Sequence, residues 1–384
     1  MIIKRSIKMP LEKSFSEKGE VTLLFGPRQA GKTTVLREII AEIGSGKAEY
    51  FSGDDVFVQE AFGKNNLEAL RRAVSGKDII VIDEAQRIAN IGLSAKLIVD
   101  ELPVKVVLSG SSSFELSNKV SEPLTGRTKT FHMHPLSWAE VAEKYKKTLP
   151  ADALEELLRF GMYPKVQTLE SDERKETYLS EYLGNYLSKD ILMFGQVRKP
   201  KKVFDLLTLL ALQVGSEVSI AELSRNLALS QQTVERYLDI LEKMFIIIQV
   251  RGFSRNLRKE ISKTSKYYFS DVGVRNAVIR NFNPMRLRGD VGALFENWFI
   301  VERMKRADNA LQPKNYYFWR TYDQQEIDLI EEQGGVLTGY ECKYSSRKGS
   351  APPRAFTEAY PDSKFVPISG VDAFRLLEEI EESL

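Results

Sequence analysis

Eight residues near the start of the chain match a pattern that binds phosphate groups. Residues 26–33 read Gly-Pro-Arg-Gln-Ala-Gly-Lys-Thr, which satisfies G-x-x-x-x-G-K-[ST] in full. Glycines let backbone N–H groups turn toward phosphate oxygens, and the N-terminus of the following helix adds positive potential. We expect Lys32 to reach the β- and γ-phosphates of ATP or a similar nucleotide, and Thr33 to offer its hydroxyl to Mg²⁺. The residues assigned to nucleotide binding are Gly26, Pro27, Arg28, Gln29, Ala30, Gly31, Lys32, Thr33 and Thr34.

Two acidic residues follow an apolar run further along the chain. Residues 79–82 read Ile-Ile-Val-Ile, and Asp83 and Glu84 come directly after them. Asp83 at the tip of a strand would hold Mg²⁺ through water, and Glu84 would polarise the attacking water as a general base. Taken alone, such a pair is more often a helix N-cap. Beside a phosphate-binding loop, it predicts hydrolysis as well as binding.

A polar residue and two arginines extend this candidate site. Ser109 follows the apolar run 104–108, where its hydroxyl would sense the γ-phosphate or hold the water. An ordinary Ser-rich turn at 109–113 is the equal alternative. Arg127 would stabilise the transferring phosphate, from the same subunit or from a neighbouring one, although a surface ion pair is its commoner role. Arg28 inside the loop is a second arginine candidate.

Three acidic residues and a lysine in the last third of the chain form a second candidate site. Glu296 lies in a helical pattern, Asp328 lies near the start of a strand, and Glu341 and Lys343 share one face of the returning strand. This order resembles the PD-(D/E)xK nuclease fold, with Glu326-Ile327-Asp328 in place of a literal Pro-Asp. The resemblance implies that Asp328 and Glu341 hold Mg²⁺, that Glu296 supports the metal, and that Lys343 stabilises developing charge. A charged hairpin with a cross-strand ion pair is the alternative.

The composition narrows the class of protein. The only cysteine is Cys342, which excludes a disulfide framework and a structural zinc site and suits a reducing cytoplasm. His132 and His134 are two ligands without a third, so packing or surface roles are favoured over a metal site. No apolar run approaches the roughly 18–20 residues that cross a bilayer, and the N-terminus has no signal-peptide pattern. We therefore expect a cytoplasmic protein without a membrane span.

The first 140 residues must form the sheet that positions the phosphate-binding loop. Apolar runs at 21–25, 79–82 and 104–108 alternate with helical patterns such as 33–43 and 67–74. This βα alternation with apolar strands predicts a doubly wound α/β fold, in which helices cover both faces of a parallel sheet.

The middle of the chain predicts a winged helix with a basic surface. Residues 219–244 have helix-turn-helix spacing, with Ser230 as N-cap of the second helix, and a hairpin pairs 245–250 with 266–269. Residues 185–280 hold 16 Lys/Arg and 9 Asp/Glu, a net charge of +7, which suits DNA phosphates. A protein-docking or interdomain module is the alternative. The residues expected to face DNA are Gln231, Gln232, Thr233 and Arg236 on the second helix and Arg251, Arg255, Arg258, Lys259 and Lys263 on the wing.

These motifs together resemble one known group. The run Leu24–Thr34 is similar to the start of prokaryotic AAA-type ATP-binding proteins, in which an AAA core precedes a C-terminal domain of unknown function. The resemblance covers almost the whole chain. It implies an ATPase core of the catalytic-glutamate class, a helical segment, a winged helix and a nuclease-like C-terminus. The later motifs that carry it are Asp83–Arg87, Leu108–Ser112, Leu124–Arg127, Gly161–Pro164 and Leu187–Ile191.

We therefore expect four parts: an AAA-type ATPase core at 1–145, a helical segment at 146–199, a winged helix at 200–280 and a nuclease-like α/β domain at 281–384. The expected activity is Mg²⁺-dependent hydrolysis of ATP to ADP and phosphate, coupled to engagement of DNA or protein by the C-terminal parts. An ATP-regulated metal-dependent DNA nuclease and a nucleotide-dependent regulatory protein with little turnover are the alternatives. Arg127 acting between subunits would require a homo-oligomer.

Overall fold

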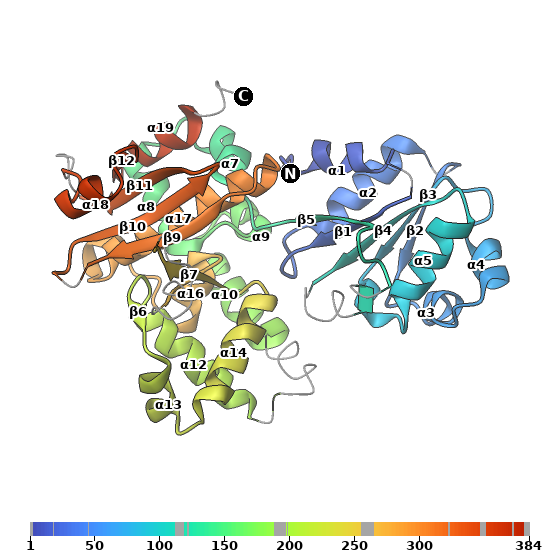
Figure 1. Cartoon of the computed structure of the whole chain (residues 1–384), viewed down its shortest axis with the longest axis horizontal. Coiled ribbons are helices and arrows are strands. Elements are labelled where there is room, and N and C mark those ends of the chain that lie inside the picture. Colours follow the sequence, from blue (N-terminus) through green and yellow to red (C-terminus); the bar gives the residue numbers. More distant parts are fainter. Residues whose placement is uncertain are drawn as a thin grey trace.

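The computed structural model reveals an N-terminal α/β unit beside a larger C-terminal body (Figure 1). Strand β5 leads from the first toward the second, and the N-terminus lies near the junction between them. The residues described are all except 1–2, 18, 45, 112–118, 121–122, 188–196, 198, 255–264, 322, 346–350, 371 and 380–384.

The N-terminal unit is built on a parallel sheet of five strands, as the sequence predicts. Their order is β2-β3-β4-β1-β5, and every neighbouring pair is parallel. Strand β4 therefore lies between β1, which leads into the phosphate-binding loop, and β3, which ends at Asp83. The strands are β1 (Val21–Phe25), β2 (Ala48–Ser52), β3 (Ile79–Asp83), β4 (Lys105–Gly110) and β5 (Thr128–His132).

Helices cover both faces of this sheet because successive strand residues point to opposite sides. Leu23 and Phe25 of β1 join one apolar cluster, which is completed by α4 and α5, while Leu24 joins the other, which is completed by α1 and α2. The central strands β1, β3 and β4 contribute apolar residues to both clusters, which explains their largely apolar sequences. The helices are α1 (Lys8–Ser14), α2 (Lys32–Ile43), α3 (Val56–Gly63), α4 (Leu67–Ala73) and α5 (Ile91–Glu101).

The C-terminal body is built on a single mixed sheet of seven strands in the order β12-β11-β10-β9-β7-β8-β6. The strands predicted for the winged-helix hairpin, β7 and β8, pair with each other antiparallel, and β7 also pairs with β9. The sheet thus runs without interruption across the division predicted at residue 280. The strands are β6 (Glu217–Val218), β7 (Ile247–Gly252), β8 (Ser265–Phe269), β9 (Asn315–Arg320), β10 (Glu326–Gln333), β11 (Val336–Lys343) and β12 (Lys364–Ser369).

One large apolar core joins the helices of this body to its sheet. Phe295, Trp298 and Phe299 of α17 lie in the same cluster as Leu206 of α12 and Leu238 of α14. The helices are α7 (Trp138–Tyr145), α8 (Pro150–Phe160), α9 (Pro164–Thr168), α10 (Asp172–Glu181), α12 (Pro200–Leu212), α13 (Ile220–Leu227), α14 (Gln231–Lys243), α16 (Val272–Val278), α17 (Val291–Asn309), α18 (Arg354–Ala359) and α19 (Asp372–Glu379), with a π-helical turn at Tyr182–Leu187 and 3₁₀ turns at Ala85–Arg87 and Met285–Leu287.

Local signals account for several element ends. Ser230 accepts a hydrogen bond from the Thr233 backbone N–H at 3.2 Å, which confirms it as the N-cap of α14. Gly161 and Pro164 separate two helices: α8 ends at Phe160, before Gly161, and α9 begins at Pro164. In the described part of the chain, no helix combines the length and apolarity that crossing a membrane requires.

Candidate nucleotide-binding site

The phosphate-binding loop joins β1 to α2 in the expected strand–loop–helix order. Gly26 is required by packing, because a Cβ there would lie 2.1 Å from the Met133 carbonyl oxygen. Gly31 is required by conformation, since its φ of 103° is unfavourable for other residues. The Lys32 side chain is buried, and its Nζ donates to the carbonyl oxygens of Gly26 at 2.7 Å and Pro27 at 3.0 Å. The lysine is thus held inside the loop, where it would meet phosphate.

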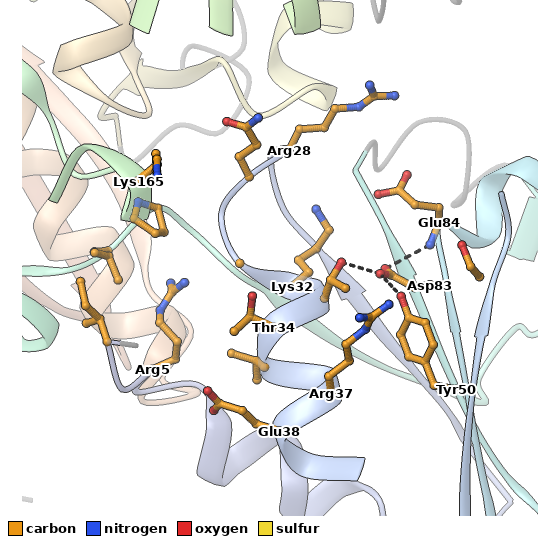
Figure 2. Close-up of a pocket in the computed structure, with 18 of the residues that line it drawn as sticks. Arg5, Arg28, Lys32, Thr34, Arg37, Glu38, Tyr50, Asp83, Glu84 and Lys165 are labelled. Carbon is orange, nitrogen blue, oxygen red and sulfur yellow. Dashed lines mark hydrogen bonds between the residues drawn. The ribbon is translucent and has the colours of Figure 1, made fainter. Parts of the chain in front are cut away.

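Asp83 lies at the centre of a hydrogen-bond network at the carboxyl edge of the sheet (Figure 2). Its Oδ2 accepts from the hydroxyls of Thr33 at 2.5 Å and Tyr50 at 2.8 Å, and its Oδ1 accepts from the Ser109 hydroxyl and from the Glu84 N–H. Burial, then the charge of Asp83, raises the pKa of Tyr50 to about 12, so the phenol stays a donor. Tyr50, in the middle of β2, is a site residue that the sequence patterns did not reveal.

Thr33 and Asp83 bring together oxygen ligands of the kind that Mg²⁺ prefers. The aspartate is 3% exposed, and its partners fix the carboxylate beside the loop. The donor chemistry therefore fits a Mg²⁺ ion, which Thr33 and Asp83 would hold together with the nucleotide.

Glu84 has a backbone conformation that is uncommon for a residue with a side chain. Its φ of 51° lies in the left-handed region, directly after the end of β3. Its Oε2 accepts from Gln86 Nε2 at 2.6 Å and from Ser111 Oγ at 3.3 Å. Such strained residues cluster at functional sites, where the surrounding structure fixes them. The carboxylate is therefore held at the cavity by two polar partners.

The site opens into a cavity of about 910 Å³ that is lined by both parts of the molecule. Thr34, Asp83 and Glu84 line it from the N-terminal unit, and Lys165 lines it from helix α9 of the C-terminal body. Figure 2 places Arg5 and Lys165 on one side of the loop and helix α2, with Tyr50, Asp83 and Glu84 on the other. The cavity is also lined by Arg28, Gln29, Arg37, Arg87 and Tyr178.

Two contacts tie the phosphate-binding loop to the rest of the chain. Tyr178 of α10 donates its hydroxyl to Gln29 Oε1 in the loop. Arg5 donates to the Ala30 carbonyl oxygen at 2.5 Å and to that of His134 at 2.7 Å, and its Nε pairs with Glu140 at 3.0 Å. The loop is therefore held from the N-terminal segment and from helix α10.

Some arginines lie at the cavity and others lie away from it. Arg127 is about half exposed, pairs with Asp100 and does not line the cavity. Arg87 does line it, and its Nε lies 2.7 Å from Asp54 Oδ1 at the cavity mouth. Arg28 lines it from within the loop. Within one subunit, Arg87 and Arg28 therefore line the cavity and Arg127 does not.

The second set of candidate residues gathers where α17 meets β10 and β11. Asp328 Oδ2 accepts from the Cys342 N–H at 2.7 Å, and Glu341 Oε1 lies 2.7 Å from Lys343 Nζ. Burial, then the charges of Glu296 and Glu341, raises the pKa of Asp328 to about 8. The structure thus brings the four predicted residues into one neighbourhood, although no described group of three or more acidic, His or Cys side chains has the arrangement of a metal site.

Lys266 of β8 belongs to the same neighbourhood and was not predicted. It is 1% exposed, and its Nζ lies 2.5 Å from Glu326 Oε1 and 3.5 Å from Glu296 Oε1. Burial alone would lower the pKa of Lys266, but the charges of Glu296 and Glu326 raise it above its usual value. The sequence pattern placed this lysine only in a hairpin strand.

The two histidines lie where the N-terminal unit meets the C-terminal body. The His132 ring is 6.1 Å from that of Phe245, which follows α14, and His134 Nε2 lies 2.6 Å from Asp308 Oδ2 of α17. Both therefore have packing or pairing roles, as predicted.

The predicted DNA-facing residues divide into two groups. Gln231, Gln232 and Arg236 are exposed at the start of α14, and Arg251 is exposed on β7. The wing residues Arg255, Arg258, Lys259 and Lys263 lie outside the described residues.

Comparison with protein families supports the nucleotide site. A family model described as an AAA domain matches residues 18–142, which contain the loop, Asp83, Glu84 and Ser109. Two domains of unknown function, DUF8612 and DUF4143, match residues 151–285 and 291–380. Together with the parallel sheet and its loop, these matches define a protein with an AAA-type P-loop ATPase domain.

Two relatives match most of the chain. The chain is 32% identical over 337 residues to the uncharacterized protein Rv2008c of Mycobacterium tuberculosis, which covers 85% of this chain and 70% of that protein. It is 22% identical over 364 residues to the uncharacterized protein MJ1544 of Methanocaldococcus jannaschii, covering 90% and 80%. The chain belongs to the family that includes Rv2008c. The AMPPCP-bound DnaA structure from Aquifex aeolicus is similar at 19% identity and a TM-score of 0.34, covering 63% of this chain and 89% of that one.

Proposed function

We propose that this protein hydrolyses ATP with Mg²⁺ and uses the cycle to change how its C-terminal body engages DNA or protein. The observation that carries the proposal is the convergence of Lys32, Asp83 and Glu84 on one cavity, with Thr33 bonded to Asp83 at 2.5 Å. A loop that only bound nucleotide would not need Glu84, whose uncommon backbone conformation and two hydrogen bonds hold its carboxylate at the cavity.

In this proposal the chain's own groups divide the work of hydrolysis. Lys32 and the loop N–H groups hold the β- and γ-phosphates, and Glu84 accepts a proton from the attacking water. The water oxygen forms a bond to the γ-phosphorus, the bond to the bridging oxygen breaks, and ADP and phosphate leave. Mg²⁺, when bound at Thr33 and Asp83, supplies charge neutralisation on the phosphate oxygens. Arg87, which lines the cavity beside Glu84, is the arginine that we assign to the transferring phosphate within one subunit.

Coupling rests on the residues that the C-terminal body places at the nucleotide cavity. Lys165 lines the cavity, and Tyr178 bonds to Gln29 of the loop, so a change in loop geometry would reach helices α9 and α10 directly. The helix-turn-helix spacing of α13 and α14 supports a winged helix, and the exposed Arg236 suits DNA phosphate.

Steady-state ATP turnover with purified full-length protein tests hydrolysis. Lys32→Ala and Glu84→Gln are expected to reduce turnover by at least about 100-fold, since both act on the transferring phosphate. Glu60→Gln is the matched control, because Glu60 is an exposed acid on α3 that pairs only loosely with Lys64. Full turnover in either of the first two variants would refute the site. Nucleotide binding with negligible wild-type turnover would favour a regulatory binding protein instead.

Duplex binding at several salt concentrations tests the DNA part of the proposal. Arg236→Ala, alone and with Arg255→Ala and Arg258→Ala, is expected to weaken binding and to reduce the salt dependence by about one unit of slope per lost phosphate contact. Arg354→Ala is the control, because this arginine is exposed on α18 and pairs with Glu358. Equal binding by all variants would favour the protein-docking alternative.

A further inference from the structure

The carboxylate cluster of the C-terminal body already contains a cation of its own. Lys266 enters it from β8, a strand of the proposed winged helix, whereas Glu296 comes from α17 and Glu326 from β10. The lysine is 1% exposed, and its ammonium bridges the two glutamates at 2.5 and 3.5 Å. A buried ammonium is stable only when it is paired in this way, so the contact is not an incidental surface bridge.

The other acids of the cluster also have internal partners. Glu296 Oε1 accepts from the Tyr268 hydroxyl at 2.6 Å, and Tyr268 lies two residues after Lys266 on β8. Asp328 accepts from the Cys342 N–H, and Glu341 pairs with Lys343. Strand β8 therefore supplies two side chains to Glu296, the acid that the nuclease resemblance assigns to supporting the metal.

These contacts fit a divalent metal poorly. Mg²⁺ requires a near-octahedral set of oxygen ligands with several waters, at about 2.0–2.1 Å. Glu296 Oε1 already accepts hydrogen bonds from both Lys266 and Tyr268. The positive charge of Lys266 would also repel a second cation near this acid. Among the described residues, no set of three acidic side chains is arranged for a metal.

We infer that Lys266 is the resident cation of this cluster, and that the cluster binds the hairpin β7–β8 to α17 and β10 instead of serving as a nuclease metal centre. The continuous seven-stranded sheet agrees with this role, because β8 and β10 are strands of the same sheet. The ion pairs then join, through side chains, two parts that the sheet already joins through backbone hydrogen bonds.

One buried oxygen of the cluster could still accept a bound cation. Glu341 Oε2 is buried and has no hydrogen-bond partner among the described residues. A cation bound beside Asp328 and Glu341 would satisfy it. Measurement of metal binding must therefore separate this position from the nucleotide site, where Asp83 is the acidic ligand.

Mn²⁺ titration of the full-length Asp83→Asn protein without nucleotide makes that separation. Binding is followed by the loss of the free Mn²⁺ electron paramagnetic resonance signal. In this background we expect no binding that depends on Asp328 or Glu341 up to millimolar Mn²⁺. Stoichiometric binding that disappears on adding Asp328→Asn or Glu341→Gln would overturn the inference. So would Mg²⁺- or Mn²⁺-dependent cleavage of plasmid DNA by wild-type protein that is lost with Asp328→Asn.

Substitution of Lys266 tests whether the cluster stabilises the fold. Lys266→Met is expected to lower Tm by several degrees, because it leaves the largely buried Glu296 without its cation, and millimolar Mn²⁺ is expected to restore part of the loss. Lys314→Met is the matched control, since Lys314 also pairs with a buried acid, Glu331, outside this cluster. An unchanged Tm in the Lys266 variant would contradict the inference. If that variant does not fold, Lys266→Arg and the Mn²⁺ titration still decide the question.

Discussion

The Tyr178 hydroxyl of helix α10 donates a hydrogen bond to the side chain of Gln29 inside the phosphate-binding loop. The two residues lie in parts of the chain that match different family models, so this contact crosses from the AAA domain to the C-terminal body. Gln29 itself has a φ of 62°, which is uncommon for a residue with a side chain. The conformation of the loop therefore depends on the contacts that hold Gln29.

Removal of this hydroxyl should loosen the loop without unfolding the protein. A neutral hydrogen bond contributes about 0.5–1.5 kcal/mol, so Tyr178→Phe is expected to weaken nucleotide binding about 2- to 12-fold. Isothermal titration with a non-hydrolysable ATP analogue measures the effect. Tyr163→Phe is the control, because its hydroxyl contacts that of Tyr182 at 2.7 Å in the same aromatic cluster. Equal losses in the two variants would mean that Tyr178 acts only through packing.

Tyr50 should act through Asp83. Partners that orient a metal ligand typically contribute 10- to 100-fold to metal affinity or activity, so Tyr50→Phe is expected to raise the Mg²⁺ concentration needed for half-maximal turnover by about tenfold or more. Because its pKa is raised to about 12, the wild-type phenol should keep its proton up to pH 10, and turnover should not fall from tyrosine ionisation between pH 7 and 10. Tyr267→Phe, in the hairpin, is the control.

Substitutions of Arg87 and Arg127 should affect turnover very differently. Arg87→Ala is expected to lower kcat by about 100-fold or more, since an arginine that stabilises transferring phosphate contributes strongly to the rate. Arg127→Ala should leave turnover within about twofold, because Arg127 is exposed and pairs with Asp100 away from the cavity. If Arg127→Ala instead abolishes turnover, and mixing with Lys32→Ala protein restores it, the arginine acts between subunits.

Asp290 should dominate the acid sensitivity of the C-terminal body. Burial opposes its ionisation, but hydrogen bonds from Arg288 and the charge of Arg275 lower the pKa of Asp290 to about 2. Its folded pKa is thus below its unfolded value, so the stabilisation is present above about pH 4 and is lost as pH falls through 2. Asp290→Asn should lower the free energy of unfolding by about 2 kcal/mol at pH 7 and flatten its dependence on pH in that window.

Urea unfolding of both proteins between pH 2 and 7 checks the effect of Asp290. Glu358→Gln, which removes an exposed ion pair with Arg354, should change stability by less than about 1 kcal/mol. An acid profile that is the same in wild type and Asp290→Asn would contradict the assignment.

Most parts of the candidate nucleotide site lie in short local patterns, which is why the sequence points to them. The loop needs glycines at fixed positions, and Asp83 and Ser109 each follow a buried strand, so their spacing reveals them. Tyr50 lies in the middle of β2, where no local pattern distinguishes it from an ordinary strand residue. Only its hydrogen bond to Asp83 reveals it as part of the site.

The rest of the site depends on contacts between distant segments, which no local pattern encodes. Lys165 and Tyr178 reach the cavity through the packing of α9 and α10, and Lys266 reaches Glu296 because β8 and α17 pack together. The same limit applies to the sheet. Residues near 250 and 317 look like members of separate domains in the sequence, yet Arg251 pairs with Tyr317 across β7 and β9.

The pairing of β7 with β9 sets a limit on how the chain can be dissected. A fragment that ends or begins near residue 281 would leave one of these strands as an open edge with unpaired backbone groups, a known template for aggregation. It would also divide an apolar core to which Leu238 and Phe299 both contribute. Useful fragments would instead divide the chain near residue 135, between β5 and α7, so that each expressed piece retains a complete sheet.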